Sequence, residues 1–162
     1  SHYIYKKMYI FADMTKETQY SELLEEIRSV IQDEKDTVAC MANVAALIHE
    51  RFGFWWTGFY RVIDNELVLG PFQGPVACTR IRKGRGVCGT SWNERRTIVV
   101  PNVHEFPGHI ACSSLSNSEI VVPVFDEIHN VTGVLDIDSR EFSTFDETDA
   151  KWLENICALI KI

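Results

Sequence analysis

The chain has no long hydrophobic segment, few basic residues, and no repeated or low-complexity tract. No apolar run approaches the roughly 20 residues that cross a bilayer, which argues against a membrane protein. A formal net charge of −7 argues against a nucleic-acid partner, because phosphate binding needs clustered Lys and Arg. The N-terminus also lacks the sustained apolar core and the cleavage pattern of a secretory signal. These absences favour a globular protein of the cytoplasm.

At 162 residues, the chain is long enough for one domain with a sizeable core. We expect residues 1–14 to be an N-terminal extension, in which Ser1 and His2 resemble a remnant of an expression tag. Residues 15–162 are expected to form the single domain.

Hydrophobic periodicity predicts an α+β fold. Apolar residues at helical spacing predict helices over 15–32, 37–51, 87–94 and 146–162. Runs rich in aromatic and β-branched residues predict strands over 54–63, 66–69, 97–100, 119–125 and 131–139. Hairpin connections imply a central antiparallel sheet, and the terminal helices are expected to pack as one layer on one face. Thr144 is the expected N-cap of the last helix, with Glu147 three residues later.

The five cysteines fall into two groups. Cys40 and Cys157 lie in apolar helical patterns and are expected to be core residues. Cys78, Cys88 and Cys112 lie in Gly- and Pro-rich segments with charges nearby, which predicts thiols on loops that do redox chemistry. The alternative is that all three are small buried hydrophobic residues, as free cysteines often are. An odd number of cysteines without an export feature fits a reducing compartment better than a disulfide scaffold.

Zinc is an alternative use of the same segments. His104, His109 and Cys112, together with Cys78 or Cys88, could supply four ligands. No two of these cysteines have the C-x₂₋₄-C spacing of a zinc site, so we expect no metal.

A basic cluster spans residues 80–85. The simpler interpretation is a solvated loop surface. The alternative is a positive field that lowers the pKa of the Cys78 and Cys88 thiols.

Acidic and aromatic side chains predict a pocket. Asp136 and Asp138 alternate along one strand and therefore face the same way, and Glu119 opens the strand before. They could be the solvent side of an edge strand, but the apolar residues around them favour a pocket floor. Clustered carboxyl groups raise one another's pKa, so one can act as an acid, and the cluster would bind an ammonium group. One or two aromatic residues of 54–60 could line a pocket for a methyl or thioether group.

The strings GPFQGPVAC, GRGVCGTSW, VHEFPGHIACSSLSNSEIVVPV and GVLDIDS together resemble the free methionine-(R)-sulfoxide reductases, small enzymes of the GAF fold. The resemblance runs from about residue 56 to 145 and implies a sheet of about six strands. One position departs from the family pattern, since Ser113 stands where an acidic residue is common.

The resemblance also implies roles for residues. Cys112 would be the nucleophile, and Cys88 and Cys78 the two thiols able to resolve the intermediate. The implied pocket residues are the carboxylates Glu119, Asp136 and Asp138 and the aromatic wall of Trp56 and Tyr60. Either Asp138 or Glu119 would protonate the sulfoxide.

The implied reaction reduces free L-methionine-R-sulfoxide through a sulfenic acid and an intramolecular disulfide. The family uses no bound cofactor; its expected reductant is thioredoxin, supplied by an NADPH-dependent system. GAF domains often form homodimers through their terminal helices. The alternative function is a non-catalytic GAF module that senses a small ligand such as a cyclic nucleotide.

Overall fold

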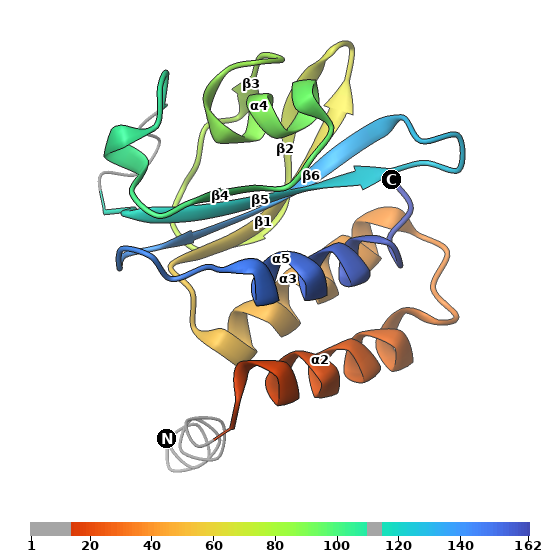
Figure 1. Cartoon of the computed structure of the whole chain (residues 1–162). Coiled ribbons are helices and arrows are strands. Elements are labelled where there is room, and N and C mark those ends of the chain that lie inside the picture. Colours follow the sequence, from red (N-terminus) through yellow and green to blue (C-terminus); the bar gives the residue numbers. More distant parts are fainter. Residues whose placement is uncertain (1–13, 110–114) are drawn as a thin grey trace.

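The computed structural model describes residues 14–109 and 115–162, and it builds this part of the chain on one six-stranded sheet (Figure 1). The helical elements are α2 (Lys16–Ile31), α3 (Thr37–Phe52), α4 (Gly86–Glu94), α5 (Glu147–Cys157) and a 3₁₀ turn, η1 (Val103–Glu105). The strands are β1 (Trp56–Ile63), β2 (Glu66–Gln73), β3 (Arg80–Ile81), β4 (Ile98–Val100), β5 (Ser118–Phe125) and β6 (Val131–Ser139). The predicted α+β class is therefore confirmed, although the two-residue strand β3 carried no sequence signal.

The strand order is β3-β2-β1-β6-β5-β4, and every pair is antiparallel. The predicted turn between β1 and β2 has both Asp64 and Asn65 in the left-handed region, as a two-residue hairpin requires. The pairing of β1 with β6 joins the two hairpins into one sheet. Strands β1, β6 and β5 consequently form its centre.

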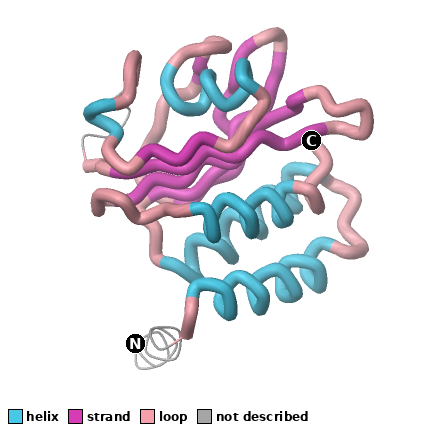
Figure 2. The backbone as a smooth tube through the Cα atoms, viewed as in Figure 1, coloured by secondary structure: helices cyan, strands magenta, loops and turns pink. Residues whose placement is uncertain are grey.

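The helices cover the sheet unequally. α3 contacts β1 and β2, α5 contacts β5, and α2 contacts α3 and α5. α2, α3 and α5 all lie below the sheet, with α2 outermost, while α4 lies above it (Figures 1 and 2). The predicted common face of the terminal helices is confirmed, but the predicted single layer is wrong because α2 forms a second tier.

The sheet separates two apolar cores because side chains of a strand alternate between its faces. Phe59, Leu135 and Ile137 are fully buried against the helices below. Tyr60 and Val134 are buried on the side of α4, in a smaller core. The lower core supplies most of the buried apolar surface, so the upper face can accommodate polar groups.

The last helix differs from its prediction at both ends. Its N-cap is Asp146, which forms a capping box with Asp149. Thr144, the predicted cap, instead donates its hydroxyl to Ser139 Oγ at 2.6 Å. The helix ends at Cys157, because the backbone NH groups of residues 159 and 160 bond to carbonyls three residues back and tighten the chain into a turn.

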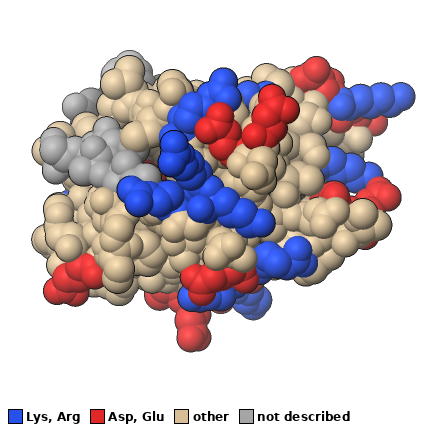
Figure 3. Space-filling model, turned by 90° about the horizontal axis from the view of Figure 1, so that it is seen from above, with Lys and Arg blue, Asp and Glu red and all other residues tan. Residues whose placement is uncertain are grey.

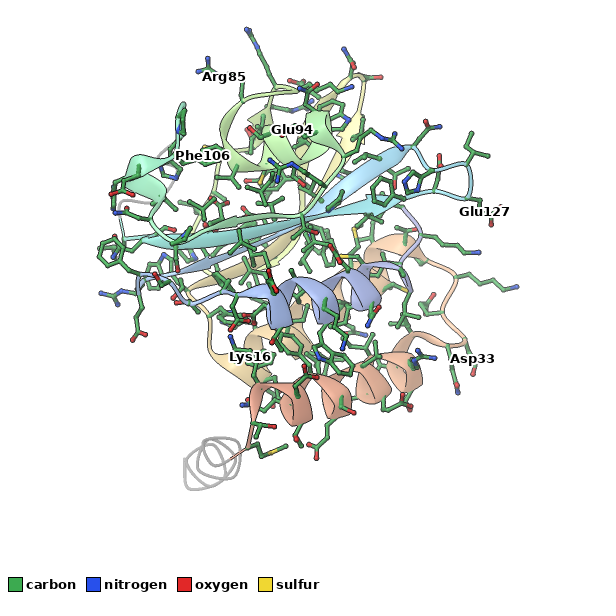
Figure 4. The ribbon with its side chains drawn as sticks, viewed as in Figure 1. Lys16, Asp33, Arg85, Glu94, Phe106 and Glu127 are labelled. Atoms are coloured by element: carbon green, nitrogen blue, oxygen red, sulfur yellow. The ribbon has the colours of Figure 1, made fainter. Side chains whose placement is uncertain are left out.

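Asp149 joins α2 to α5. It is 1% exposed, and its Oδ1 accepts from the Tyr20 hydroxyl at 2.6 Å. Its Oδ2 lies 2.7 Å from Lys16 Nζ, and Figure 4 shows Lys16 where the two helices begin. A buried charge needs such partners, so this cluster fixes how the outer helix packs.

Replacing Tyr20 with Phe should lower the free energy of unfolding by about 1.5–3 kcal/mol, because it removes a hydrogen bond to a charged, buried acceptor. The measurement is urea unfolding followed by circular dichroism. The control is Glu17→Gln, which weakens the exposed bond from Trp152 Nε1 to Glu17 Oε2 and should change stability by less than about 0.5 kcal/mol. Equal effects would show that the buried cluster does not hold α2.

Candidate active site

A cavity of about 60 Å³ lies on the α4 side of the sheet. Its predicted lining residues are Trp56 and Tyr60 of β1, Cys88 of α4, Glu119 of β5, and Asp136 and Asp138 of β6. Six of the eight site residues predicted from the sequence thus meet around one cavity. Cys78 lies beside it, and Cys112 lies outside the described residues.

Strand register explains why the acids meet. Glu119 pairs with Asp138 across β5 and β6, and Asp138 pairs with Trp56 across β6 and β1. Asp136 lies opposite Gly58, where a Cβ atom would clash with the Trp56 ring. Only glycine leaves room for the indole there. The pocket-floor interpretation is confirmed, and the edge-strand interpretation is wrong because β6 is a central strand.

The three acidic side chains lie next to one another in the pocket. Glu119 and Asp136 are each 6% exposed, and Ser116 Oγ donates to Asp138 Oδ1 at 3.2 Å. Burial, then the charges of Asp136 and Asp138, raise the pKa of Glu119 well above its ordinary value. Burial, then the charge of Asp136, also raise the pKa of Asp138 well above its ordinary value. Protonated carboxyl groups therefore persist in the pocket at a pH where exposed ones are ionised.

Asp136 is the hydrogen-bond acceptor of the cluster. Burial raises its pKa, and hydrogen bonds from Glu119 and Cys88 oppose that rise. Its Oδ1 nevertheless has no hydrogen-bond partner among the residues that the structure describes, although it is shielded from solvent. A buried acceptor without a partner marks a place for a ligand atom.

Cys88 lies in the first turn of α4, inside the helix predicted over 87–94 and not on a loop, and it is a free thiol only 4% exposed. Burial, then the charges of Asp136 and Glu119, raise its pKa well above the ordinary value. The proposed activation of this thiol by the basic cluster is therefore wrong.

The basic residues of 80–85 face solvent instead. Arg80, Arg82, Lys83 and Arg85 are all exposed. Arg80 pairs with Glu66 at 3.0 Å. Lys and Arg side chains gather on the face that carries α4 (Figure 3), and Arg85 points away from the sheet (Figure 4). This exposure agrees with the solvated-surface interpretation.

Cys78 is held beside the aromatic wall. The Tyr60 hydroxyl donates to the Cys78 carbonyl at 2.8 Å, and Trp56 Nε1 donates to the Pro75 carbonyl at 3.0 Å. The indole also stacks on Phe72, with ring centroids 5.2 Å apart. Cys78 is disulfide-bonded.

The other cysteines are less uniform than predicted. Cys157 is buried and free, as expected of a core residue. Cys40 is free but partly exposed, and its Sγ lies 3.7 Å from the Glu34 carbonyl in a groove beside Lys35 and Lys161. The core prediction for Cys40 is wrong because α3 turns this face away from the sheet.

The zinc set considered from the sequence does not assemble among the described residues. His109 lines the cavity, but His104 Nε2 pairs with Asn117 Oδ1 at 2.9 Å and does not line it. A different group does converge in the described part of the chain: one ligand atom each from Cys88, Glu119 and Asp136, all within 4.8 Å of one another.

Three cavity residues were not predicted to line the pocket. Arg85 and Ser116 line the cavity, and His109 was considered only as a zinc ligand. Ser116 lies three residues before Glu119, in a run of polar residues whose fold the pattern did not predict.

Comparison with known proteins places these features in a family. The GAF domain model matches residues 34–162. GAF domain-containing protein A of Dictyostelium discoideum is 55% identical over 90% of this chain and 92% of its own length. The free methionine-R-sulfoxide reductase of Escherichia coli is 42% identical over 91% of this chain and 90% of its own length. The free methionine-R-sulfoxide reductase of Neisseria meningitidis, solved with its substrate, is 53% identical and has a TM-score of 0.87. The match covers 89% of this chain and 87% of that one.

The fold and the matched model make this chain a GAF domain protein. Within that class, it belongs to the family of free methionine-R-sulfoxide reductases and is an oxidoreductase. No helix of the described residues has both the length and the apolar content needed to cross a membrane.

The raised pKa of Glu119 predicts a pH-dependent loss of stability. In strong acid, Glu119 is protonated in both the folded and the unfolded chain. As the pH rises, the unfolded chain releases this proton first, so the folded state loses stability up to the raised pKa. Glu119→Gln, which mimics the protonated acid, should therefore raise stability near neutral pH and leave it unchanged in acid.

Urea unfolding of both proteins at pH 4 and pH 8 measures this difference. Glu127→Gln, at a side chain 87% exposed, serves as the control and should shift stability equally at both values. A stabilisation by Glu119→Gln that is the same at both pH values would contradict the raised pKa of Glu119.

Proposed function

We propose that the chain reduces free L-methionine-R-sulfoxide to L-methionine. The observation that carries this proposal is the acid cluster. Among the described residues, no Lys or Arg pairs with Glu119, Asp136 or Asp138, although all three face the cavity. The ammonium group of a free amino acid would supply the missing cation, and the names of the E. coli and N. meningitidis relatives support this substrate.

The aromatic wall suits the other end of the substrate. Trp56 and Tyr60 stack with ring centroids 6.0 Å apart and present apolar surface to the cavity. A sulfoxide carries a methyl group that packs on such a surface and an oxygen that accepts a hydrogen bond. The pocket thus offers separate contacts to the charged end, the sulfinyl oxygen and the methyl group of the substrate.

In the proposed first step, the Cys112 thiolate attacks the sulfoxide sulfur. A sulfoxide is a poor electrophile until its oxygen is protonated, and Glu119 or Asp138 supplies that proton because its pKa is raised. The protonated oxygen then moves to Cys112 as the new sulfur–sulfur bond and the sulfur–oxygen bond of the substrate both break, so the proton stays on the oxygen. The products are methionine and the sulfenic acid of Cys112.

In the second step, the Cys78 thiol condenses with the sulfenic acid, which gives a disulfide and water. The redox state of Cys78 supports this choice, because Cys78 is disulfide-bonded whereas Cys88 is free. Cys88 holds its proton at neutral pH and is a poor resolving thiol. We assign it the role of donating a hydrogen bond to Asp136.

An external dithiol then reduces the disulfide, and thioredoxin, recharged by NADPH, is the proposed reductant. The enzyme needs no bound cofactor for this cycle, because the electrons come from sulfur throughout. The alternative of a ligand sensor has less support, since a pocket that only binds has no need of a disulfide-forming cysteine beside it. The homodimer remains a prediction from the resemblance.

Single cysteine variants separate the two steps. Cys112→Ser should release no methionine, since no other thiol is proposed to attack. Cys78→Ser should release one equivalent of methionine and then stop under thioredoxin, because sulfenic acid formation does not need it. Cys40→Ser is the control and should keep full turnover. A Cys78→Ser enzyme that turns over while Cys88→Ser stops after one equivalent would reverse their roles.

Blocking the ammonium tests the acid cluster. N-acetyl-methionine-R-sulfoxide should have a kcat/KM about 100-fold lower than the free amino acid, since an unpaired buried charge costs about 3 kcal/mol. Asp136→Asn should shrink this preference, because one acid no longer needs the ammonium. The measurement is steady-state kinetics with both substrates. Equal kcat/KM values would mean that the pocket recognises only the sulfoxide.

A further inference from the structure

Cys88, Glu119 and Asp136 come from α4, β5 and β6, and one ligand atom of each lies within 4.8 Å of the others. All three residues are buried, at 4%, 6% and 6% exposure. In a tetrahedral zinc site, bonds of about 2.3 Å to sulfur and 2.0–2.2 Å to oxygen put ligand atoms about 3.3–3.6 Å apart. Small side-chain rotations toward a common point would bring the three atoms to that spacing.

The unpartnered oxygen of Asp136 is a second observation that points to a ligand. Oδ1 is shielded from solvent and accepts no hydrogen bond from the described part of the chain, and Asp136 faces the cavity. The same cavity is also lined by the imidazole of His109, a fourth side chain of a ligating type. An electropositive ligand between Cys88, Glu119 and Asp136 would satisfy the orphaned oxygen and balance the negative charge of the two carboxylates.

The donor set selects the kind of metal. One thiolate with two carboxylates suits borderline and soft divalent ions, of which Zn²⁺ is the first choice. Mg²⁺ and Ca²⁺ require six or more oxygen ligands and do not take a thiolate. Zinc in this position would replace the protons on Cys88 and Glu119, so binding releases protons.

We propose that the reductase pocket also binds Zn²⁺ through Cys88, Glu119 and Asp136, and that zinc and substrate exclude each other there. The exclusion rests on the proposed function, because it requires the substrate ammonium to use the same carboxylates. The metal site itself does not depend on it. Zinc is here an inhibitor of the pocket and takes no part in the thiol chemistry.

Cobalt is the probe for the site. The full chain is isolated without reductant, so that Cys78 stays in its disulfide, and is titrated with Co²⁺. We expect a sulfur-to-cobalt charge-transfer band with the visible bands of tetrahedral Co²⁺, at one equivalent, displaced by one equivalent of Zn²⁺ and not by excess Mg²⁺. The absence of any such band would overturn the proposal.

Variants identify the ligands. Cys88→Ser should abolish the charge-transfer band, and Asp136→Asn should weaken Co²⁺ binding at least 10-fold, by the scale of lost metal ligands. Cys40→Ser, which removes the partly exposed free thiol, is the matched control and should leave the spectrum unchanged. If Cys88→Ser fails to fold, Asp136→Asn decides the question. A band that survives both Cys88→Ser and Asp136→Asn, or that disappears in Cys40→Ser, would overturn the proposal.

Kinetics then test the shared pocket. At ten times its dissociation constant, Zn²⁺ should raise the substrate concentration that gives half the limiting single-turnover rate about elevenfold and leave the limiting rate unchanged, as competition requires. The assay measures methionine formed in a single turnover, so that zinc binding by the recycling proteins does not interfere. Zinc binding without competition would contradict the exclusion, and a cobalt band in a protein that forms no methionine would refute the proposed function alone.

Discussion

Burial of Glu119 and Asp136 on the middle of the sheet, with the half-buried Asp138 beside them, is the constraint on which the rest of the structure depends. Glu119, Asp136 and Asp138 cannot all ionise together at such short range in a poorly solvated pocket. The pocket is therefore unfavourable for folding without a ligand, and the apolar core on the opposite face must offset it. Residues such as Phe59 and Ile137, next to pocket residues in the chain, contribute to that core.

The two faces of the sheet consequently have different tasks. The face toward α3 and α5 holds the larger core, and the outer helix α2 is fixed to it through the buried Asp149. The face toward α4 holds the cavity and is bordered by exposed basic residues. Acids on the central strands are placed more rigidly than acids on loops, which suits a group that must deliver a proton to one oxygen atom.

The acidic cluster also affects the thiol beside it. Cys88 lies against the acids, whose charges, together with burial, raise its pKa and favour a protonated thiol that donates a hydrogen bond to Asp136. Cys78 lies outside the acid cluster, on a segment tied to Trp56 and Tyr60, and takes part in a disulfide. The two cysteines therefore differ in state: Cys88 is a buried thiol with a raised pKa, whereas Cys78 is disulfide-bonded.

The sequence alone determined the α+β class, the hairpins and most strands, because period-two and helical patterns depend on neighbouring residues. It also determined that Asp136 and Asp138 share a face, and its motifs identified the family. Tertiary structure decided that β6 is central, because only the pairing of β1 with β6 buries these acids. It likewise placed Cys88 against Asp136 and gave Asp146 rather than Thr144 the helix cap. Burial and charge proximity arise between segments distant in sequence, so the high pKa of Cys88 could not be read from the Gly and Arg residues beside it.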